Sequence, residues 1–186
     1  MSKKQAKNTW YPLDNAGVLY SAIQKDRYSA IYRFSAVMTE PVNPPLLQRA
    51  VEKTMPRFPG FAVRMRRGAF WCYFEPNPNP GPFVKQDMVN PCQPVRFRED
   101  NEWLDRIFYY EHRISLEVFH AISDGAGTLV FFRTLLAVYL RELGYAIPNG
   151  PGILDITQPP RKEELEDAYA KYAGQRILRD KLEKTA

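Results

Sequence analysis

The segment from Ile114 to Leu143 constrains the fold of this chain more than any other part of the sequence. Apolar residues alternate from Ile114 to Val118, and this period of two predicts a strand whose buried face continues to His120. From Leu129 onward, apolar residues recur at helical spacing as far as Leu143. A strand that passes within a few residues into a long apolar helix predicts a helix layer packed against a sheet.

The rest of the chain also mixes strands and helices. The segment from Arg27 to Thr39 is rich in aromatic and aliphatic residues, which predicts a strand. Pro44 and Pro45 favour the start of a helix that continues to about Met55, because proline fits the first helical turn. This order predicts an α/β fold, an α+β layered sandwich with a mixed sheet and flanking helices. The other expected elements are helices over 14–24 and 163–172, a hairpin of 61–67 and 69–75, and paired strands over 107–111 and 114–122.

Proline and glycine mark the segments without regular structure. Six of the 16 prolines fall within 76–94, which predicts an irregular loop or an edge structure. Residues 145–160 are rich in both proline and glycine and predict a linker. We therefore expect a domain over 1–145, followed by a linker and charged helical tail over 146–186.

Composition limits the class of protein. Hydrophobic residues make up 45% of the chain and aromatic residues 13%, which predicts a packed globular core. No stretch approaches the roughly 20 apolar residues that span a bilayer, and the N-terminus lacks a signal-peptide core. We therefore expect no membrane span and a cytoplasmic location. Cys72 and Cys92 have neither CxxC nor zinc-site spacing, so no metal site is expected, and Cys72 reads as a small buried hydrophobe.

The net charge of +5 does not by itself indicate a nucleic-acid-binding protein. Lys and Arg are scattered along the chain, apart from a cluster at Arg57, Arg64, Arg66 and Arg67. Nucleic-acid binders usually carry a denser basic stripe, so we expect no nucleic-acid partner. The cluster could attract an anionic ligand such as a phosphorylated cofactor. The interpretation that we favour is a set of solvated arginines at a strand edge.

A short motif joins the strand to the long helix. It reads His120-Ala121-Ile122-Ser123-Asp124-Gly125, and the only other histidine is His112. An imidazole at a strand end can act as a general base, since the ordinary pKa of histidine lies near neutrality. Asp124 can cap the helix or pair with an arginine, and Gly125 allows close backbone approach. A histidine that ends a strand without any catalytic role is the competing interpretation.

Other catalytic and phosphate-binding motifs fit this region poorly. The run Gly125-Ala126-Gly127 matches neither a P-loop nor the dinucleotide fingerprint. Ser115 and Ser123 do not lie in a G-x-S-x-G elbow, and Cys92 has no histidine at a telling spacing.

The motif from His120 to Gly125 resembles the signature of the CoA-dependent acyltransferase superfamily. This superfamily includes chloramphenicol acetyltransferase, alcohol acetyltransferases and the condensation domains of nonribosomal peptide synthetases. The segments from Trp10 to Asp14 and from Gly152 to Asp155 look like the alcohol acetyltransferase branch. The resemblance implies a chloramphenicol acetyltransferase-like fold and covers most of the chain.

The resemblance also implies a chemistry. His120 would be the general base that deprotonates an acceptor alcohol or amine, which then attacks an acyl thioester directly. Asp124 would be a structural support, usually paired with an arginine, and Gly125 would keep the loop tight. Acyl-CoA, with acetyl-CoA as the first candidate, would be a co-substrate, and no resident cofactor is implied.

The length of the chain departs from the family, whose members are roughly twice as long and consist of two similar halves. We therefore expect an N-terminal half that has little activity alone and that binds a C-terminal half or self-associates. The alternatives are a condensation-domain-like fragment that uses carrier-protein thioesters and a non-catalytic interaction domain that keeps the fold.

Overall fold

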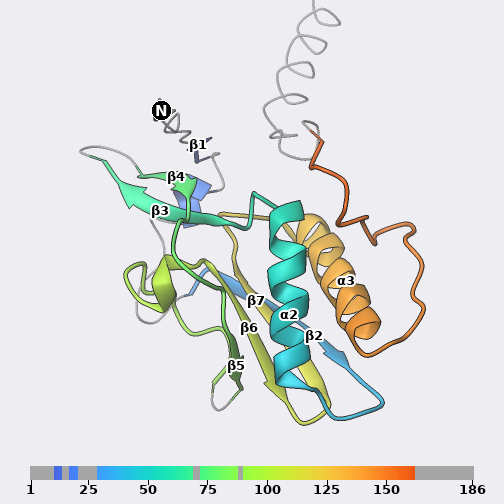
Figure 1. Ribbon diagram of the computed structural model, residues 1–186. Coiled ribbons are helices and arrows are strands. Elements are labelled where there is room, and N and C mark those ends of the chain that lie inside the picture. Colours follow the sequence, from blue (N-terminus) through green and yellow to red (C-terminus); the bar gives the residue numbers. More distant parts are fainter. Residues whose placement is uncertain (1–10, 14–16, 21–28, 69–71, 88–89, 162–186) are drawn as a thin grey trace, which may run out of the picture.

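The computed structural model describes residues 11–13, 17–20, 29–68, 72–87 and 90–161. These residues form two sheets and two long helices (Figure 1). Of the expected helix over 14–24, residues 17–20 are helical, and 14–16 and 21–24 lie outside the described residues. The expected helix over 163–172 lies entirely outside them.

The larger sheet has four strands in the order β2-β7-β6-β5. Neighbours β2, β7 and β6 are antiparallel, whereas β5 lies parallel to β6 at the edge, so the sheet is mixed as expected. The edge strand β5 falls inside the proline-rich segment for which a loop or edge structure was expected. The strands are β2 (Ile31–Val37), β5 (Val84–Gln86), β6 (Asp105–Tyr110) and β7 (Arg113–Phe119).

The smaller sheet contains the expected hairpin. Strands β3 (Val63–Arg67) and β4 (Cys72–Pro76) pair antiparallel, and the short β1 (Tyr11–Pro12) adds to the free side of β4. Residues 69–71, between these two strands in the sequence, lie outside the described residues. Cys72 is half-buried against the apolar side chains of this sheet, so it is less buried than the sequence suggested.

Helices α2 (Pro44–Thr54) and α3 (Gly125–Glu142) lie side by side on one face of the four-stranded sheet (Figure 1). The α2 helix begins where expected, because Asn43 Oδ1 accepts a hydrogen bond from Leu46 N at 3.2 Å and Pro44 opens the first turn. It ends in a 3-10 turn, Met55–Arg57. A second 3-10 turn, Asp100–Glu102, precedes β6. None of the helices in the described residues is long and apolar enough to cross a bilayer.

The main core lies between these helices and the sheet. Ile114, Leu116 and Val118 of β7 are fully buried there, as their alternation predicted. They pack with Phe131 and Leu135 of α3, which are also fully buried. Burial of such side chains contributes roughly 1.5–3 kcal/mol each, so this layer fixes where the end of β7 lies.

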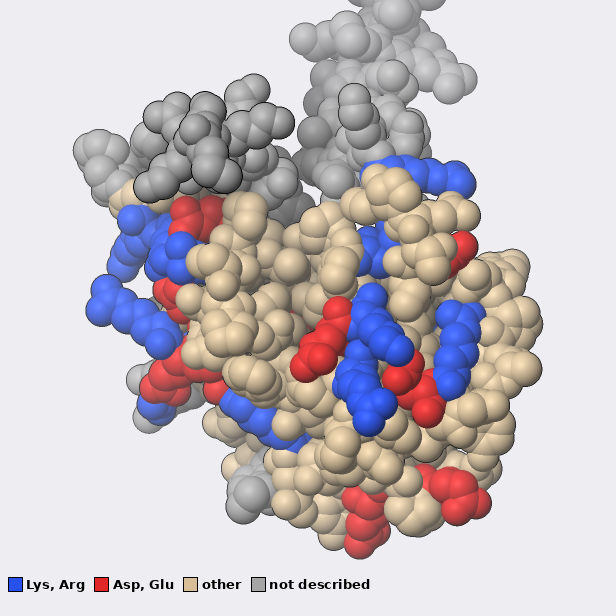
Figure 2. Space-filling view, viewed as in Figure 1, with Lys and Arg blue, Asp and Glu red and all other residues tan. Residues whose placement is uncertain are grey.

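Only part of the arginine cluster is a solvated strand edge. Arg67 is exposed at the end of the edge strand β3, as expected. Arg64 and Arg66 are paired, because Arg64 Nη2 lies 2.6 Å from Glu75 Oε1 and Arg66 Nη1 lies 2.5 Å from Glu102 Oε1. Arg57 is only 6% exposed, so it does not fit the expectation. On the face shown in Figure 2, basic and acidic side chains are interspersed, which is not the basic stripe of a nucleic-acid-binding surface.

Residues after α3 run back along that helix (Figure 1). Arg141 Nε donates a hydrogen bond to Ile147 O at 2.8 Å, and Leu154 N donates to Thr134 Oγ1 at 3.0 Å. The segment is irregular, as expected of a linker, although it is held against α3 as far as it is described. The division of the chain at 145 stays a prediction.

Candidate functional site

His120 follows the last residue of β7 directly. Its backbone N–H donates to Ala30 O at 2.8 Å, and the N–H of Phe119 donates to Leu104 O at 2.9 Å. These two bonds hold the end of β7 between the start of β2 and the start of β6. The His120 side chain is half-buried, so the ring lies at the surface end of the core layer.

Two tyrosine rings hold the imidazole. The ring of Tyr20 stacks on His120 with a centroid distance of 4.3 Å and an interplanar angle of 18°. Tyr32 of β2 contacts it at 4.8 Å with an angle of 58°. Among the described residues, no hydrogen bond to either imidazole nitrogen is found. These two ring contacts set the plane of the imidazole.

The hydroxyl of Tyr32 fixes the loop after His120. Its oxygen lies 2.6 Å from Thr128 Oγ1, 2.9 Å from Asp124 O and 3.0 Å from Ser123 O. Burial raises the pKa of Tyr32 to about 12, so the phenol stays protonated and can donate to a carbonyl at physiological pH. One strand residue therefore both contacts the imidazole and anchors the first turn of α3.

Asp124 caps α3. Its Oδ1 accepts a hydrogen bond from Gly127 N at 2.7 Å, the capping role that the sequence allowed. No ion pair between Asp124 and an arginine is found in the described part of the chain. The close approach expected at Gly125 lies instead at Gly127. A Cβ at Gly127 would lie 2.8 Å from Ser123 Oγ, whereas one at Gly125 would meet nothing within 4 Å.

We expect Asp124→Ala to lower the free energy of unfolding by about 1 kcal/mol, because the N–H of Gly127 loses its acceptor. Asp124→Asn should recover most of this loss, since an amide oxygen also caps a helix well. Urea denaturation of the three proteins measures both effects. A loss in the asparagine variant as large as in the alanine variant would assign Asp124 a role that depends on its charge.

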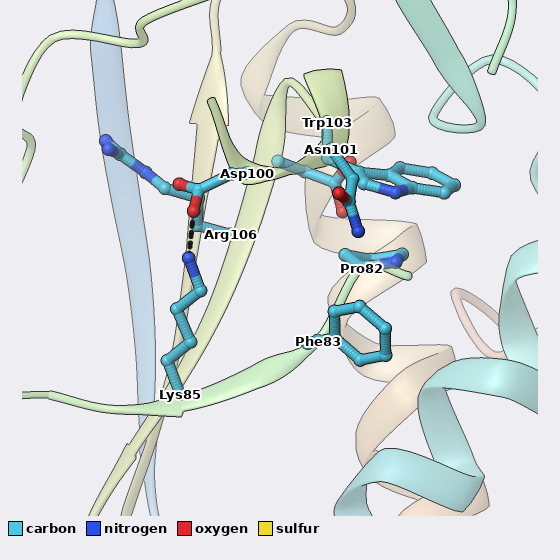
Figure 3. Close-up of a pocket in the computed structure, with 8 residues that line it drawn as sticks. Pro82, Phe83, Lys85, Asp100, Asn101, Trp103 and Arg106 are labelled. Carbon is cyan, nitrogen blue, oxygen red and sulfur yellow. Dashed lines mark hydrogen bonds and ion pairs between the residues drawn. The ribbon is translucent and has the colours of Figure 1, made fainter. Parts of the chain in front are cut away.

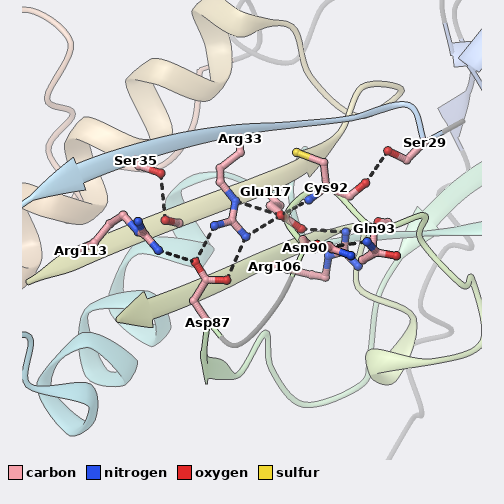
Figure 4. A network of polar contacts seen from close by, with 11 residues as sticks. Ser29, Arg33, Ser35, Asp87, Asn90, Cys92, Gln93, Arg106, Arg113 and Glu117 are labelled. Carbon is pink, nitrogen blue, oxygen red and sulfur yellow. Dashed lines mark hydrogen bonds and ion pairs between the residues drawn. The ribbon is translucent and has the colours of Figure 1, made fainter. Parts of the chain in front are cut away.

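A second polar cluster lies on the sheet face opposite the helices, and the sequence analysis missed it (Figure 4). Glu117 of β7 is only 2% exposed. Its Oε1 accepts hydrogen bonds from Arg33 Nε at 2.9 Å and from Cys92 N at 2.5 Å, and its Oε2 lies 2.8 Å from Arg106 Nη2. Arg33 Nη1 also lies 2.6 Å from Asp87 Oδ2. The sequence did carry one signal for this cluster: charged residues stand among apolar ones in β2, β6 and β7, and Arg33, Arg106 and Glu117 lie on the same face of these three neighbouring strands.

The groups of this cluster favour a structural role over a catalytic one, as the pKa shifts of two of them indicate. Hydrogen bonds from Arg33 hold the pKa of Asp87 below its usual value. Burial, and then the charge of Glu117, raise the pKa of the Cys92 thiol, so it stays protonated and is a poor nucleophile. A cavity of about 440 Å³ opens beside these residues, and His120 does not line it.

No family model matches the chain, and no curated protein matches it significantly. Solved structures do match. The first condensation domain of the calcium-dependent antibiotic synthetase aligns with a TM-score of 0.55 and 20% identity, over 77% of this chain and 40% of its own. The starter condensation domain of rhizomide synthetase aligns with a TM-score of 0.59 and 14% identity, over 77% and 40%. The X-domain from teicoplanin biosynthesis aligns with a TM-score of 0.58 and 15% identity, over 100% and 42%.

The chain has the condensation-domain fold. This confirms the predicted α/β layered sandwich with a mixed sheet. It does not support the alcohol acetyltransferase branch in particular. The chain spans about 40% of the length of the condensation domains that it matches.

Proposed function

We propose that this chain is a catalytic lobe of a condensation-type acyltransferase, with His120 as its general base. An acceptor amine attacks the carbonyl carbon of an acyl thioester, and the imidazole of His120 takes the proton that the nitrogen loses. The C–S bond then breaks, the thiol leaves with a proton, and an amide forms. His120 releases its proton in the same cycle, so atoms and charge balance.

The position of His120 is the observation that carries this proposal. Its imidazole is half-buried, is held by two tyrosine rings and lies at a strand end next to a capped helix. A general base needs a nitrogen within hydrogen-bond reach of the acceptor, and that nitrogen must be fixed in direction. Stacking on Tyr20 and contact with Tyr32 fix the plane of the ring, which supports this role.

A carrier-protein thioester is the donor that we favour over acyl-CoA. The similar structures are condensation domains of peptide synthetases, which supports the condensation-domain alternative over the acyl-CoA and alcohol interpretation. Both donors present the same thioester to His120, so the reacting atoms do not distinguish them. The two donors differ in what the pantetheine arm is attached to, which is a carrier protein in one and a nucleotide in CoA.

Donor and acceptor choice tests the proposal. The chain, alone and supplied with a C-terminal condensation-domain lobe, is given the same acyl group on a carrier protein or on CoA. Amide formation with an amine acceptor and ester formation with a long-chain alcohol are followed by mass spectrometry. We expect amide from the carrier-bound donor to form at least about tenfold faster than any other product. Faster ester formation from acyl-CoA would restore the alcohol acetyltransferase interpretation.

A docking role is the second candidate, and one comparison favours it. The X-domain from teicoplanin biosynthesis, which has the same fold, has been solved in complex with OxyB, and this chain aligns with that X-domain at a TM-score of 0.58. A non-catalytic domain of this kind would give no product with any donor, with or without a second lobe.

A further inference from the structure

Tyr32 connects β2 to both the imidazole and the loop that follows it. In the register of the sheet, Tyr32 pairs with Val118 of β7, two residues before His120. Its ring contacts the imidazole at a centroid distance of 4.8 Å, and its hydroxyl reaches the carbonyls of Ser123 and Asp124. A single side chain therefore contacts the motif at both of its ends.

The oxygens around the Tyr32 hydroxyl determine where its proton lies. In the described structure, the two carbonyl oxygens lie 3.0 and 2.9 Å from Tyr32 Oη, and Thr128 Oγ1 lies 2.6 Å from it. A carbonyl oxygen can only accept, so the one proton of the phenol is shared between Ser123 O and Asp124 O. The Thr128 hydroxyl then donates to Tyr32 Oη, which still has a lone pair.

This arrangement is buried on the helix side. Thr128 is 0% exposed, and its backbone N–H donates to Asp124 O at 3.0 Å. Buried hydroxyls and carbonyls need hydrogen-bond partners, so loss of the Tyr32 hydroxyl leaves several groups of the first turn of α3 short of one. The start of the motif is held separately, because the N–H of His120 donates to Ala30 O at 2.8 Å.

We propose that Tyr32 is a positioning residue for His120, whose hydroxyl, fixed by Thr128, holds the loop over 120–124 so that the imidazole keeps one direction toward the acceptor. The inference rests on the proposed role of His120 as general base. Tyr32 takes no part in the proton transfer, since its phenol stays protonated at physiological pH. A displacement of about 1 Å at a reacting group can cost about 100-fold in rate, so a small shift of this loop matters.

Tyr32→Phe tests this role, because it removes the hydroxyl and keeps the ring against the imidazole. The Hε1–Cε1 NMR signal of His120 reports on the ring in the chain itself. Turnover is measured with a C-terminal lobe, a carrier-bound donor and an amine acceptor. We expect the His120 signal to shift or split while that of His112 stays. We also expect kcat to fall about tenfold, by the same factor at every pH, with the KM of the acceptor within about twofold.

Thr128 supplies a second pair of variants. Thr128→Val removes the hydroxyl that donates to Tyr32 and keeps the shape of the side chain, so the His120 signal should move in the same direction as in Tyr32→Phe. Thr128→Ser keeps the hydroxyl and should leave that signal where it is in the unmodified chain.

Two control variants lie away from the motif. Tyr110→Phe removes the same atom from a tyrosine that is 44% exposed at the end of β6. Lys85→Gln changes a charge in the cavity of about 260 Å³ at the β5 edge, where Lys85 forms an ion pair with Asp100 (Figure 3). Neither Tyr32 nor His120 lines that cavity. Both variants should leave the His120 signal and kcat unchanged.

A folded Tyr32→Phe chain with an unchanged His120 signal and a kcat within about twofold overturns the inference. If that variant does not fold, an unchanged His120 signal in Thr128→Val overturns it instead. His120→Gln separates the inference from the proposed function. If it slows the reaction and Tyr32→Phe does not, His120 remains the base and Tyr32 has no positioning role. If His120→Gln leaves the rate unchanged, the general-base proposal fails, and the His120 signal still decides whether Tyr32 holds the ring.

Discussion

Replacing His120 by glutamine slows amide formation by about 10²–10⁴-fold if the imidazole is the general base. Glutamine preserves polarity and much of the volume, so the Tyr20 and Tyr32 contacts change less than with alanine. It cannot take up the proton that the acceptor nitrogen loses. The rate is measured under single turnover, with the chain supplied with a C-terminal lobe and a carrier-bound donor.

His112 provides a matched control for this variant. It is the only other histidine of the chain, and it lies exposed in the turn between β6 and β7. His112→Gln should leave the rate within about twofold of the unmodified chain. If His120→Gln and His112→Gln react equally fast, His120 has no role in proton transfer. A loss of rate that tracks a loss of folded protein in urea would point to a packing role alone.

Glu117→Ala is expected to have the largest effect on stability, a loss of about 3–5 kcal/mol in the free energy of unfolding. The carboxylate is 2% exposed and holds Arg33, Arg106 and the N–H of Cys92. Without this carboxylate, the guanidinium groups of Arg33 and Arg106 each lose a partner on the sheet face opposite the helices. Arg33 keeps Asp87, which limits the loss.

Two variants separate charge from packing at this position. Glu117→Gln keeps an acceptor oxygen and the side-chain shape, and we expect it to lose clearly less than Glu117→Ala. Glu99→Ala removes a carboxylate that is 62% exposed and paired only with Arg96 in the described structure, so the change should stay within about 0.5 kcal/mol. Urea denaturation measures all three. A loss below about 1 kcal/mol for Glu117→Ala would show that the buried network contributes little to stability.

Local patterns in the sequence predicted the layer that positions the candidate site. The alternation of Ile114, Leu116 and Val118 predicted which side chains of β7 enter the main core, because a strand places every second side chain on one side. The segment that becomes α3 carried both a cap and a helical apolar period. These patterns depend only on residues that are close together in the chain, so they can be recognised in a single sequence.

The partners that come from distant segments could not be predicted. Glu117 looked like the polar side of a strand, and its burial depends on Arg33, which is 84 residues away in the chain. The close approach expected at Gly125 lies two residues later, at Gly127, because the side chains of Ser123 and Asp124 fold back over the first turn of the helix.

Whether His120 is the general base is tested most directly by a crystal structure of the chain, with a C-terminal lobe if one is needed for binding, in complex with a non-hydrolysable aminoacyl-pantetheine analogue. We expect the acceptor nitrogen within about 2.6–3.2 Å of an imidazole nitrogen of His120, or joined to it through one water molecule. An analogue bound out of that reach, for example beside Glu117 on the opposite sheet face, would contradict it.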